Sequence, residues 1–275
     1  MSDKVFTLKQ IAKQIRKDVL VSLAEAGSGH LGASLGLADI FTALYFELMH
    51  INPENPRWED RDRLIVSIGH VAPVIYSTLA NRGFFDRKEL LTLRKLGSRL
   101  QGHSTPNHGL PGVEVSTGSL GQGLSIAVGV ALAGKIKNSK WNVYCIMGDG
   151  ELQEGQVWEA AMSAPNKHLD NLIAIVDRNN CQIDGYVSDV LDVEPLDKKW
   201  KAFNWNVLEA DGNNIREFID TVNAAKTLKN GNPTVIIART LMGKGVKSIE
   251  NDCSWHGKPP TKEQLPLFLD ELEKM

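Results

Sequence analysis

The sequence has few cysteines and no cysteine motif. Cys145, Cys181 and Cys253 are far apart, they are odd in number, and no two of them form a CxxC pair. A disulfide framework or a cysteine-based zinc site requires paired cysteines at regular spacing. We therefore expect three reduced thiols with structural roles, as in a cytoplasmic protein.

Long apolar runs and an excess of one charge are also absent. No apolar run approaches the ~20 residues that cross a membrane, and the start, MSDKVFTLKQ, has no signal-peptide core. The 275 residues carry a formal charge of −2, whereas general nucleic-acid-binding proteins are strongly basic. We expect a cytoplasmic protein that binds neither nucleic acid nor a membrane.

Segments of strand character alternate with segments of helical spacing. Strands are expected at 63–68, 142–147, 172–176, 206–210 and 233–239. Helices are expected at 7–27, 34–48, 71–81, 86–95, 121–137, 154–167, 195–204, 214–228 and from Thr261 onward. This alternation predicts an α/β fold, a mainly parallel sheet with helices on both faces. No shift in composition marks a boundary, so we expect residues 1–275 to form a single domain.

A long loop is expected between the helices at 86–95 and 121–137. Residues 96–120 are rich in Gly, Ser and Thr, and loops of this length in compact domains are usually functional. The loop ends in the glycine-rich turn 118–123, GSLGQG, which opens the next helix. Backbone N–H groups at such a turn can bind an anion, although many helices begin after a glycine.

A carboxylate and an amide follow two neighbouring strands. Asp149 lies in a Gly-Asp-Gly turn after 142–147, and Asn179 follows 172–176. The carboxyl ends of two parallel strands joined by one helix lie side by side. Their side-chain oxygens and a nearby backbone carbonyl suit Mg²⁺ or Ca²⁺, with water and phosphate completing the shell. The spacing equally allows Asp149 to cap a helix and Asn179 to form an Asx turn.

Histidines adjoin glycines more often than composition predicts. Of seven histidines, five touch a glycine: His30, His70, His103, His108 and His256. Only roughly one is expected by chance at this glycine content. Neutral imidazoles can hold hydroxyls or a diphosphate and can transfer protons near neutral pH. No HxH or HxxxH spacing occurs, so the sequence does not indicate a histidine zinc site.

Several blocks together resemble one enzyme family. GDGELQEG followed by LIAIVDRNNCQIDG resembles the motif that binds thiamine diphosphate and Mg²⁺. The flanking blocks resemble transketolase: SGHLGASLG at 28–36, DRLIVSIGH at 62–70, LGSRLQGH at 96–103, GVEVSTGSLGQGLSIAVG at 112–129 and SWHGKPP at 254–260. They occur in the family's order over nearly the whole chain.

The resemblance implies a set of cofactor-binding residues. The metal ligands would be Asp149, Asn179 and the carbonyl of Cys181, with Mg²⁺ as the expected ion and Ca²⁺ or Mn²⁺ as alternatives. The residues around thiamine diphosphate would be His70, Gly118, Leu120, Gly150, Asn179 and His256. Glu154 matches an acidic residue at the family's subunit contact. Met242 departs from the pattern, because relatives carry a cofactor-contacting Lys or Ile at that position.

The resemblance also implies a reaction. His30, His103 and His256 match histidines around the hydroxyls of a ketose substrate. His30 and His256 would help to deprotonate the C3 hydroxyl, so that the C3–C4 bond breaks, and His103 would hold the C1 hydroxyl. A two-carbon ketol unit would pass from a ketose phosphate to an aldose phosphate. Leu31 replaces the proline of the family's GHPGA block.

The match covers only the amino-terminal part of a transketolase. It implies a split enzyme in which a second chain supplies the pyrimidine-binding domain, with two copies of each chain in a heterotetramer, although a fragment of a longer chain would read the same. Pentose phosphates are the default substrates, and the sequence does not identify the sugar.

Two other functions stay open from the sequence. One is a subunit of another thiamine-diphosphate enzyme, either 1-deoxyxylulose-5-phosphate synthase-like or 2-oxoacid decarboxylating; the LGSRLQGH and SWHGKPP blocks speak against it. The other is a non-catalytic cofactor-binding module. The intact set of His30, His70, His103, Asp149, Asn179 and His256 speaks against that function.

Overall fold

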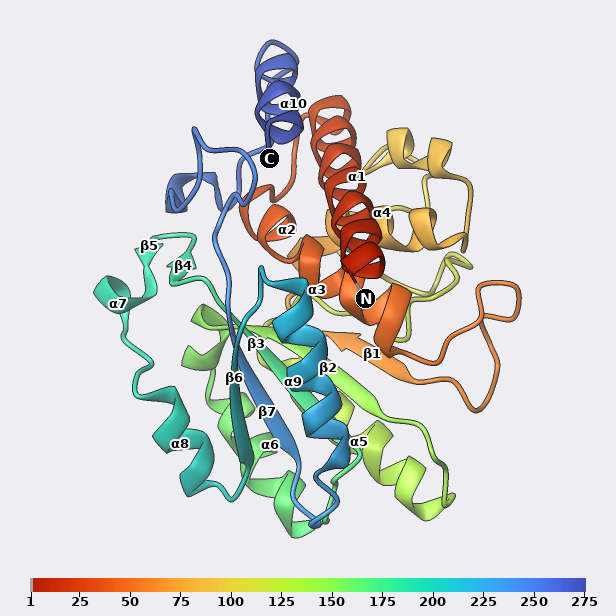
Figure 1. Cartoon of the computed structure of the whole chain (residues 1–275), viewed down its shortest axis with the longest axis vertical. Coiled ribbons are helices and arrows are strands. Elements are labelled where there is room, and N and C mark those ends of the chain that lie inside the picture. The colour runs from red at the N-terminus through yellow and green to blue at the C-terminus, as the bar shows by residue number, and fades with distance from the viewer. Residues whose placement is uncertain (1) are drawn as a thin grey trace.

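A five-stranded parallel sheet forms the centre of the computed structural model, which describes residues 2–275 (Figure 1). Its strand order is β1-β2-β3-β7-β6, and all four pairings are parallel. The strands are β1 (Arg63–Val66), β2 (Val143–Gly148), β3 (Leu172–Arg178), β6 (Asn206–Asp211) and β7 (Thr234–Arg239). The predicted parallel sheet is confirmed, with strand ends within two residues of those expected.

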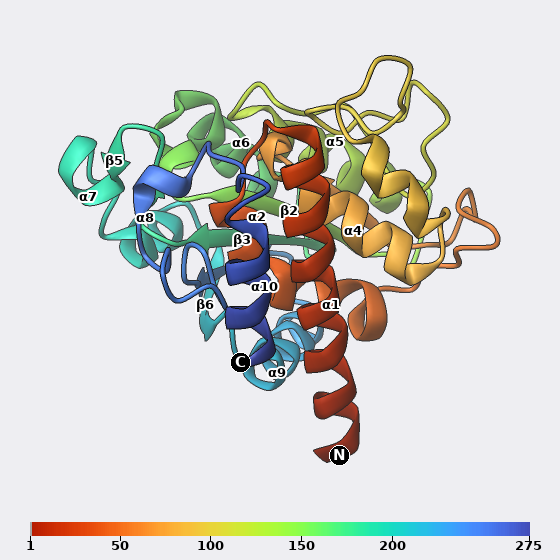
Figure 2. The ribbon, with the colours of Figure 1, turned by 90° about the horizontal axis from the view of Figure 1, so that it is seen from above.

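Helices cover both faces of the sheet, as predicted. Side chains alternate along each strand, so Tyr144 and Ile146 of β2 enter one apolar core while Cys145 and Met147 enter the other. The first core lies under α1 (Ser2–Ala26), α2 (Gly32–Gly36), α3 (Ala38–Ala43), α4 (Ala72–Arg82), α9 (Ile215–Thr227) and α10 (Leu265–Glu273). The second lies under α5 (Gln122–Ile136), α6 (Gly155–Asn166) and α8 (Leu196–Ala202). Figure 2 shows α5 and α6 on one side of the sheet and α9 on the other.

The helix expected at 34–48 is interrupted. It consists of α2, α3 and a π-helical turn, η1 (Leu44–Leu48). The break between α2 and α3 lies beside the buried guanidinium of Arg16, whose Nε donates a hydrogen bond to the carbonyl of Leu35 at 3.0 Å. The same guanidinium forms an ion pair with the buried carboxylate of Asp39. A long-range contact therefore overrides the helical spacing of this segment.

Other helix boundaries also differ from those expected. The first helix begins at Ser2, and Thr7 lies inside it with its hydroxyl donating to the carbonyl of Asp3. The segment after Asp86 is a short 3₁₀ helix, η3 (Arg87–Thr92), which Asp86 caps as predicted. The terminal helix begins at Leu265, four positions after Thr261. The predicted loop at 96–120 contains neither helix nor strand.

Two segments leave the sheet side by side. After β3, residues 179–190 form the small hairpin β4 (Cys181–Gln182) and β5 (Gly185–Tyr186) and the short helix α7 (Val187–Val190). After β7, residues 240–256 end in the 3₁₀ turn η5 (Cys253–Trp255). Because β3 and β7 are neighbours in the sheet, these segments start from adjacent carboxyl ends.

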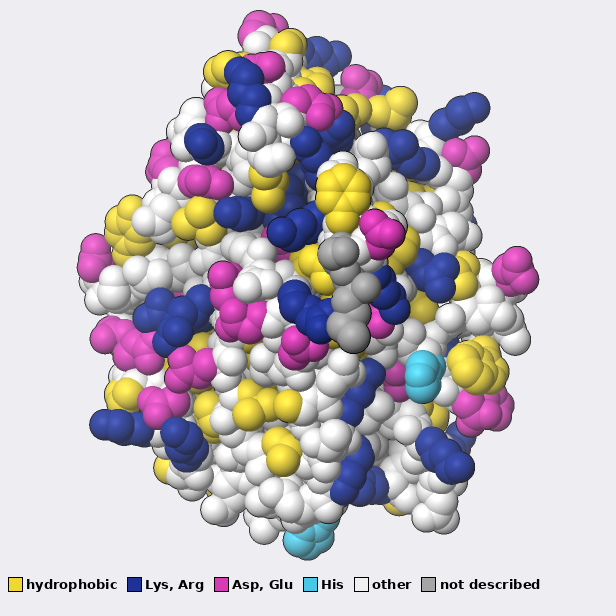
Figure 3. All heavy atoms as spheres, viewed as in Figure 1, with side chains coloured by type: hydrophobic (Ala, Val, Ile, Leu, Met, Phe, Trp, Pro, Cys, Tyr) yellow, Lys and Arg dark blue, Asp and Glu magenta, His cyan; other side chains and the backbone are white. Residues whose placement is uncertain are grey.

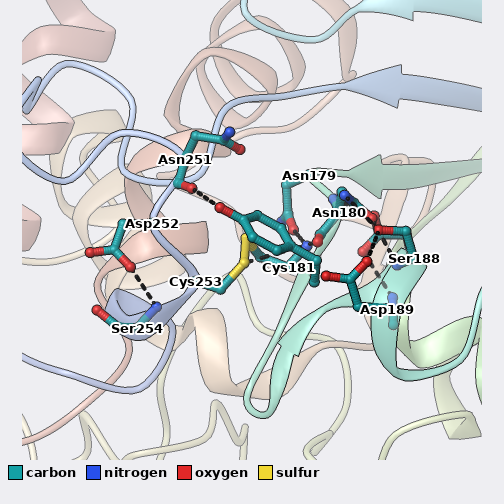
Figure 4. Close-up of a disulfide and its surroundings, with 12 residues drawn as sticks. Asn179, Asn180, Cys181, Ser188, Asp189, Asn251, Asp252, Cys253 and Ser254 are labelled. Carbon is teal, nitrogen blue, oxygen red and sulfur yellow. Dashed lines mark hydrogen bonds between the residues drawn. A yellow bond between two sulfur atoms is a disulfide. The ribbon is translucent and has the colours of Figure 1, made fainter.

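This adjacency corrects the expectation of three reduced thiols. A disulfide joins Cys181 to Cys253, 72 positions later in the chain (Figure 4), and Cys145 is the free, buried cysteine. Spacing along the sequence could not reveal the pair, because the two thiols meet only through the order of strands in the sheet.

The surface matches the modest formal charge. On the face drawn in Figure 3, Lys and Arg side chains are interspersed with Asp and Glu. Among residues 2–275, no helix combines the length and the apolar character required to span a membrane.

Candidate active site

A cavity of about 270 Å³ lies beyond the carboxyl ends of β2 and β3. Of the predicted site residues, its walls include His30, His70, Leu120, Asp149, Gly150, Asn179, Cys181 and His256. The structure thus brings together residues that are spread over more than 220 positions of the sequence. His103 and Gly118 are the two predicted residues that lie outside these walls.

Asp149 is positioned by the turn that follows β2. One carboxylate oxygen accepts a hydrogen bond from the backbone N–H of Gly150 at 2.8 Å, and the other accepts one from Asn180 at 2.6 Å. The side chain is only 2% exposed, and this burial raises its pKa to about 6. The charge of Arg178 and the two backbone donors oppose that rise only in part.

Asn179 is oriented by a buried acid two positions before it. Its amide nitrogen donates to Asp177 at 2.8 Å, and its amide oxygen accepts from the N–H of Cys181 at 2.8 Å. Asp177 also accepts a hydrogen bond from the hydroxyl of Thr240. Burial, followed by the nearby charge of Asp149, raises the pKa of Asp177 to about 7, and the hydrogen bonds from Thr240 and Asn179 oppose this rise. The carboxylate therefore sets which end of the amide faces the cavity.

The two local functions left open from the sequence are both present. Asp149 caps the 3₁₀ turn η4 (Gly150–Gln153), and Asn179 forms an Asx turn with Cys181. These contacts use one lone pair on each oxygen, and carboxylate and amide oxygens have two. Capping and ligand binding are therefore compatible here.

The donor chemistry fits a hard divalent cation. Among residues 2–275, no group of three or more His, Cys, Asp and Glu side chains has metal-binding geometry. The predicted set contains one such side chain, Asp149, together with an amide oxygen and a backbone carbonyl. Oxygen sets of this kind suit Mg²⁺ or Ca²⁺. Two buried carboxylates, Asp149 and Asp177, also favour a cation, because buried negative charge is costly without one.

Three histidine rings pack together at the cavity. Ring centroids are 4.9 Å apart for His30 and His70, 5.1 Å for His70 and His256, and 5.7 Å for His30 and His256. Burial, followed by the charge of His256, lowers the pKa of His70 to about 3 and that of His30 to about 4. Burial also lowers the pKa of His256. All three rings are therefore neutral near pH 7.

Two of these rings have nitrogen atoms without a partner. Nδ1 of His30 and Nδ1 of His256 are buried and have no hydrogen-bond partner among the described residues. Buried polar atoms are nearly always paired in folded proteins. Since both rings line the cavity, the missing partners are best supplied by a ligand with hydroxyl groups.

His103 and Gly118 lie against each other beside the cavity. A Cβ atom at Gly118 would be 2.8 Å from Cδ2 of His103, and the φ of Gly118 is +147°, so both space and backbone conformation require glycine there. His103 is exposed, which is compatible with a position at the entrance. Partial loss of water around its ring, followed by the charge of Arg94, lowers the pKa of His103.

Arg94 and Glu151 are site residues that sequence reasoning missed. The guanidinium of Arg94 lies 3.0 Å from the position of a Cβ at Gly102, and its charge also lowers the pKa of His30. The carboxylate of Glu151 is 2% exposed and lines the cavity. Glu151 lies two residues after Asp149, which could have pointed to the site. From spacing alone, however, it looks the same as a charged residue on the surface of an ordinary helix.

The remaining positions of interest differ in placement. Glu154 is exposed at the edge of the cavity, as an interface residue would be. Met242 is fully buried and does not line the cavity. It packs beneath Gly32, where a Cβ atom would lie 2.1 Å from the methionine sulfur.

Comparisons with known proteins identify the family to which the chain is similar. Residues 7–269 match the family described as "Transketolase, thiamine diphosphate binding domain". The chain is 43% identical to a 6-deoxy-6-sulfo-D-fructose transketolase subunit of Clostridium sp. (strain MSTE9), over 100% of this chain and 99% of that one. It is 43% identical to an apulose-4-phosphate transketolase subunit of Actinobacillus succinogenes, over 97% of this chain and 96% of that one.

A solved structure gives the same result for the fold. The transketolase of Campylobacter jejuni superposes with a TM-score of 0.87 and 35% identity, over 96% of this chain. The chain spans only 43% of that transketolase, whereas it matches the two named subunits over nearly their full length. The chain therefore belongs to the transketolase family. It corresponds to the amino-terminal, thiamine-diphosphate-binding part of a transketolase.

Proposed function

We propose that this chain, the thiamine-diphosphate-binding component of a transketolase, transfers a two-carbon ketol unit from a ketose phosphate to an aldose phosphate together with a second chain. The observation that carries the proposal is the cluster of three neutral histidines beside Asp149 and Asn179, with two buried nitrogen atoms that lack a partner. Such a cluster offers proton acceptors beside a place for an anionic cofactor.

Each predicted residue has a role in this proposal. Thiamine diphosphate, when bound, supplies the carbanion chemistry that carries the two-carbon unit. Asp149, Asn179 and the Cys181 carbonyl hold the divalent cation, with Mg²⁺ preferred and Ca²⁺ or Mn²⁺ as alternatives. The cofactor-contacting residues are Gly150 and His70 at the diphosphate, His256 near it, and Gly118 and Leu120 along the cofactor.

The histidines act on the substrate. His30 and His256, neutral near pH 7, together help to remove the proton of the donor's C3 hydroxyl, which one of the two rings accepts, so that the C3–C4 bond can break. His103, beside the cavity, holds the C1 hydroxyl. Depressed pKa values keep these rings available as bases and hydrogen-bond acceptors.

The partner is proposed to be a carboxyl-terminal transketolase chain with the pyrimidine-binding domain, with two copies of each chain. The names of the two full-length relatives support this, because both are called transketolase subunits. Pentose phosphates are the default substrates, and the relatives' names add 6-deoxy-6-sulfo-D-fructose and apulose 4-phosphate to the candidates. We also propose a cytoplasmic location, which fractionation beside a cytoplasmic marker would test.

Reconstitution tests the proposal. The chain is assayed alone and with a candidate carboxyl-terminal transketolase chain, with Mg²⁺ and thiamine diphosphate, using xylulose 5-phosphate and the two relatives' sugars as donors. Activity is expected only from the pair. Asp149→Ala should lower kcat/KM at least about 100-fold, while Asp189→Ala, which removes an exposed carboxylate on α7, should not. Full activity of the chain alone contradicts the split enzyme, and an active Asp149→Ala variant contradicts the metal site.

A further inference from the structure

We infer that Cys181 and Cys253 form a reversible thiol–disulfide site that sets the affinity of the cavity for its cofactor. The inference rests on the proposed cofactor site and adds redox control to it. The disulfide joins two segments that contribute to that site from different parts of the chain (Figure 4). Cys145 is not involved, because it is buried in the second core.

Cys181 belongs to the segment that follows β3. It lines the cavity, and its N–H donates to the side-chain oxygen of Asn179 at 2.8 Å. Its backbone carbonyl is the third proposed metal ligand. A change in the position of Cys181 therefore moves two of the three proposed ligands.

Cys253 belongs to the segment that follows β7. It opens the turn η5, and its carbonyl accepts a hydrogen bond from the N–H of His256 at 2.9 Å. His256 in turn lines the cavity with an unpartnered Nδ1. The disulfide consequently connects the proposed metal ligands directly to a histidine of the proposed substrate site.

The non-covalent contacts between the two segments are close to solvent. The hydroxyl of Tyr186 donates to the carbonyl of Asn251 at 3.0 Å, and Ile183 packs against Gly257, the residue that follows the second segment. Tyr186 is 38% exposed and Ile183 is 65% exposed, whereas Cys181 and Cys253 are 4% and 8% exposed. The buried covalent link is therefore the firmest tie between the segments, and its loss leaves them held by contacts that water can replace.

Reduction should weaken cofactor binding. With the disulfide intact, Asn179, Cys181 and His256 are held in one arrangement, and preorganised groups bind more tightly because less order is lost on binding. Coupling is reciprocal, so a cofactor that prefers the disulfide form must also favour formation of the disulfide. If the disulfide form binds the cofactor tenfold more tightly, saturating cofactor lowers the midpoint reduction potential of this two-electron couple by about 30 mV.

The chemistry is thiol–disulfide exchange with a thiol such as glutathione. A glutathione thiolate attacks one sulfur, and the other cysteine leaves as a thiolate and takes up a proton. A second glutathione then breaks the mixed disulfide, so that two protons and two electrons end on Cys181 and Cys253 and glutathione disulfide is released. Glutathione disulfide drives the reverse reaction. Such pairs in reducing compartments are typically transient and redox-sensing.

The test combines thiol counting with cofactor binding. The chain, together with its carboxyl-terminal partner, is equilibrated in buffers of varied glutathione to glutathione disulfide ratio, quenched with acid and alkylated after unfolding. In this chain, mass spectrometry should find one free thiol at the oxidising end and three at the reducing end. Calorimetry with Mg²⁺ should give an affinity for thiamine diphosphate about tenfold higher in the oxidised form, and saturating cofactor should shift the midpoint by about 30 mV.

Two variants separate the disulfide from general effects of reductant. Cys253→Ala retains every backbone group and should bind cofactor with the affinity of the reduced form in all buffers. Cys145→Ala should keep the full redox response of the natural chain. If Cys253→Ala does not fold, the natural chain in excess reductant provides the same comparison.

The outcomes distinguish this inference from the proposed function. Three free thiols in every buffer, or equal cofactor affinity in both redox forms, overturn the redox control and leave the cofactor site intact. A complex that binds no cofactor in either form contradicts the cofactor site and the redox control together, while the thiol count still reports whether the disulfide forms.

Discussion

At the scale of single residues, the cavity combines neutral bases with buried acids. His30 and His70 have strongly lowered pKa values, while Asp149 and Asp177 have raised ones. Burial is the largest cause in all four cases, because it disfavours whichever form of a group is charged. Exclusion of solvent thus keeps the imidazoles neutral, so that they can accept protons. It also makes the charged form of the two carboxylates costly unless a cation lies beside them.

His70 provides a test through the pH dependence of stability. Its folded pKa of about 3 lies below the ordinary value of 6.5, so between these values the unfolded chain binds a proton that the folded chain does not. Stability from this group is present above pH ~6.5 and falls as the pH drops toward 3, by up to about 1.4 kcal/mol per pH unit. His70→Asn removes that dependence, so urea unfolding should show a shallower loss of stability from pH 7 to pH 4.

A matched control comes from another histidine. His168 is exposed in the turn between α6 and β3, and its positive φ of 52° is one that asparagine tolerates well. His168→Asn should leave the slope of the natural chain unchanged. Parallel curves for the natural chain and His70→Asn would show that His70 does not titrate as its burial implies.

The predictability of these residues depended on where they lie. Asp149 and Asn179 could be placed together from sequence because each directly follows an apolar strand, and neighbouring strand ends meet. Arg94, Glu151 and the Cys181–Cys253 pair could not be placed. Their partners come from other elements of the fold. Local spacing in the sequence does not show that the segments after β3 and β7 meet, or that Arg94 in a loop lies near His30 and His103.

At the scale of elements, Glu151 ties together the structures that surround the cavity. Its carboxylate accepts hydrogen bonds from the N–H of Gly121 at 2.7 Å and of Gly148 at 3.2 Å, and from the hydroxyl of Ser67. Ser67 also accepts from the N–H of Gly123 at 2.9 Å. One buried side chain thereby joins the ends of β1 and β2 to the start of α5.

Replacement of Glu151 tests this tie. Glu151→Ala leaves three donors without an acceptor, two of them buried and that of Gly148 partly buried, and we expect the free energy of unfolding to fall by about 3–5 kcal/mol. Glu151→Gln keeps the shape of the side chain and one carbonyl oxygen as an acceptor, so this variant should lose less unfolding free energy than Glu151→Ala. Glu159→Ala, an exposed position on α6, serves as the control and should change stability by less than about 0.5 kcal/mol. Equal small effects of all three would refute a structural role for the tie, and urea unfolding measures each.

Elements were predictable to the extent that their signals are local. The strands were predicted within two residues because each is an apolar run between turn residues. The break between α2 and α3 was not predicted, because the residue beside it comes from another element. Arg16 of α1 donates a hydrogen bond to the carbonyl of Leu35 there. The hairpin of β4 and β5 has two residues per strand, too few for an alternating pattern to be recognised.

At the scale of the whole molecule, one sheet carries two apolar cores. Adjacent residues of the same strand, such as Tyr144 and Cys145, point into opposite cores. Neither core can lose its packing without disturbing strands that the other core also requires. We therefore retain the single domain expected over residues 1–275 as a prediction about cooperative unfolding.

A substitution in the first core should be felt in the second. Leu20 of α1 is fully buried in the first core, and Leu20→Ala should lower stability by about 2–5 kcal/mol. Trp141, Trp200 and Trp205 lie in the opposite core, so tryptophan fluorescence chiefly reports on that face, while circular dichroism reports on helices of both. If the sheet couples the cores, both signals shift to lower urea by the same amount, whereas Leu267→Ala, at an exposed position on α10, shifts neither. A fluorescence transition that stays in place while the helical signal splits would instead divide the chain into two units, because the strands would then be stable with only one face covered.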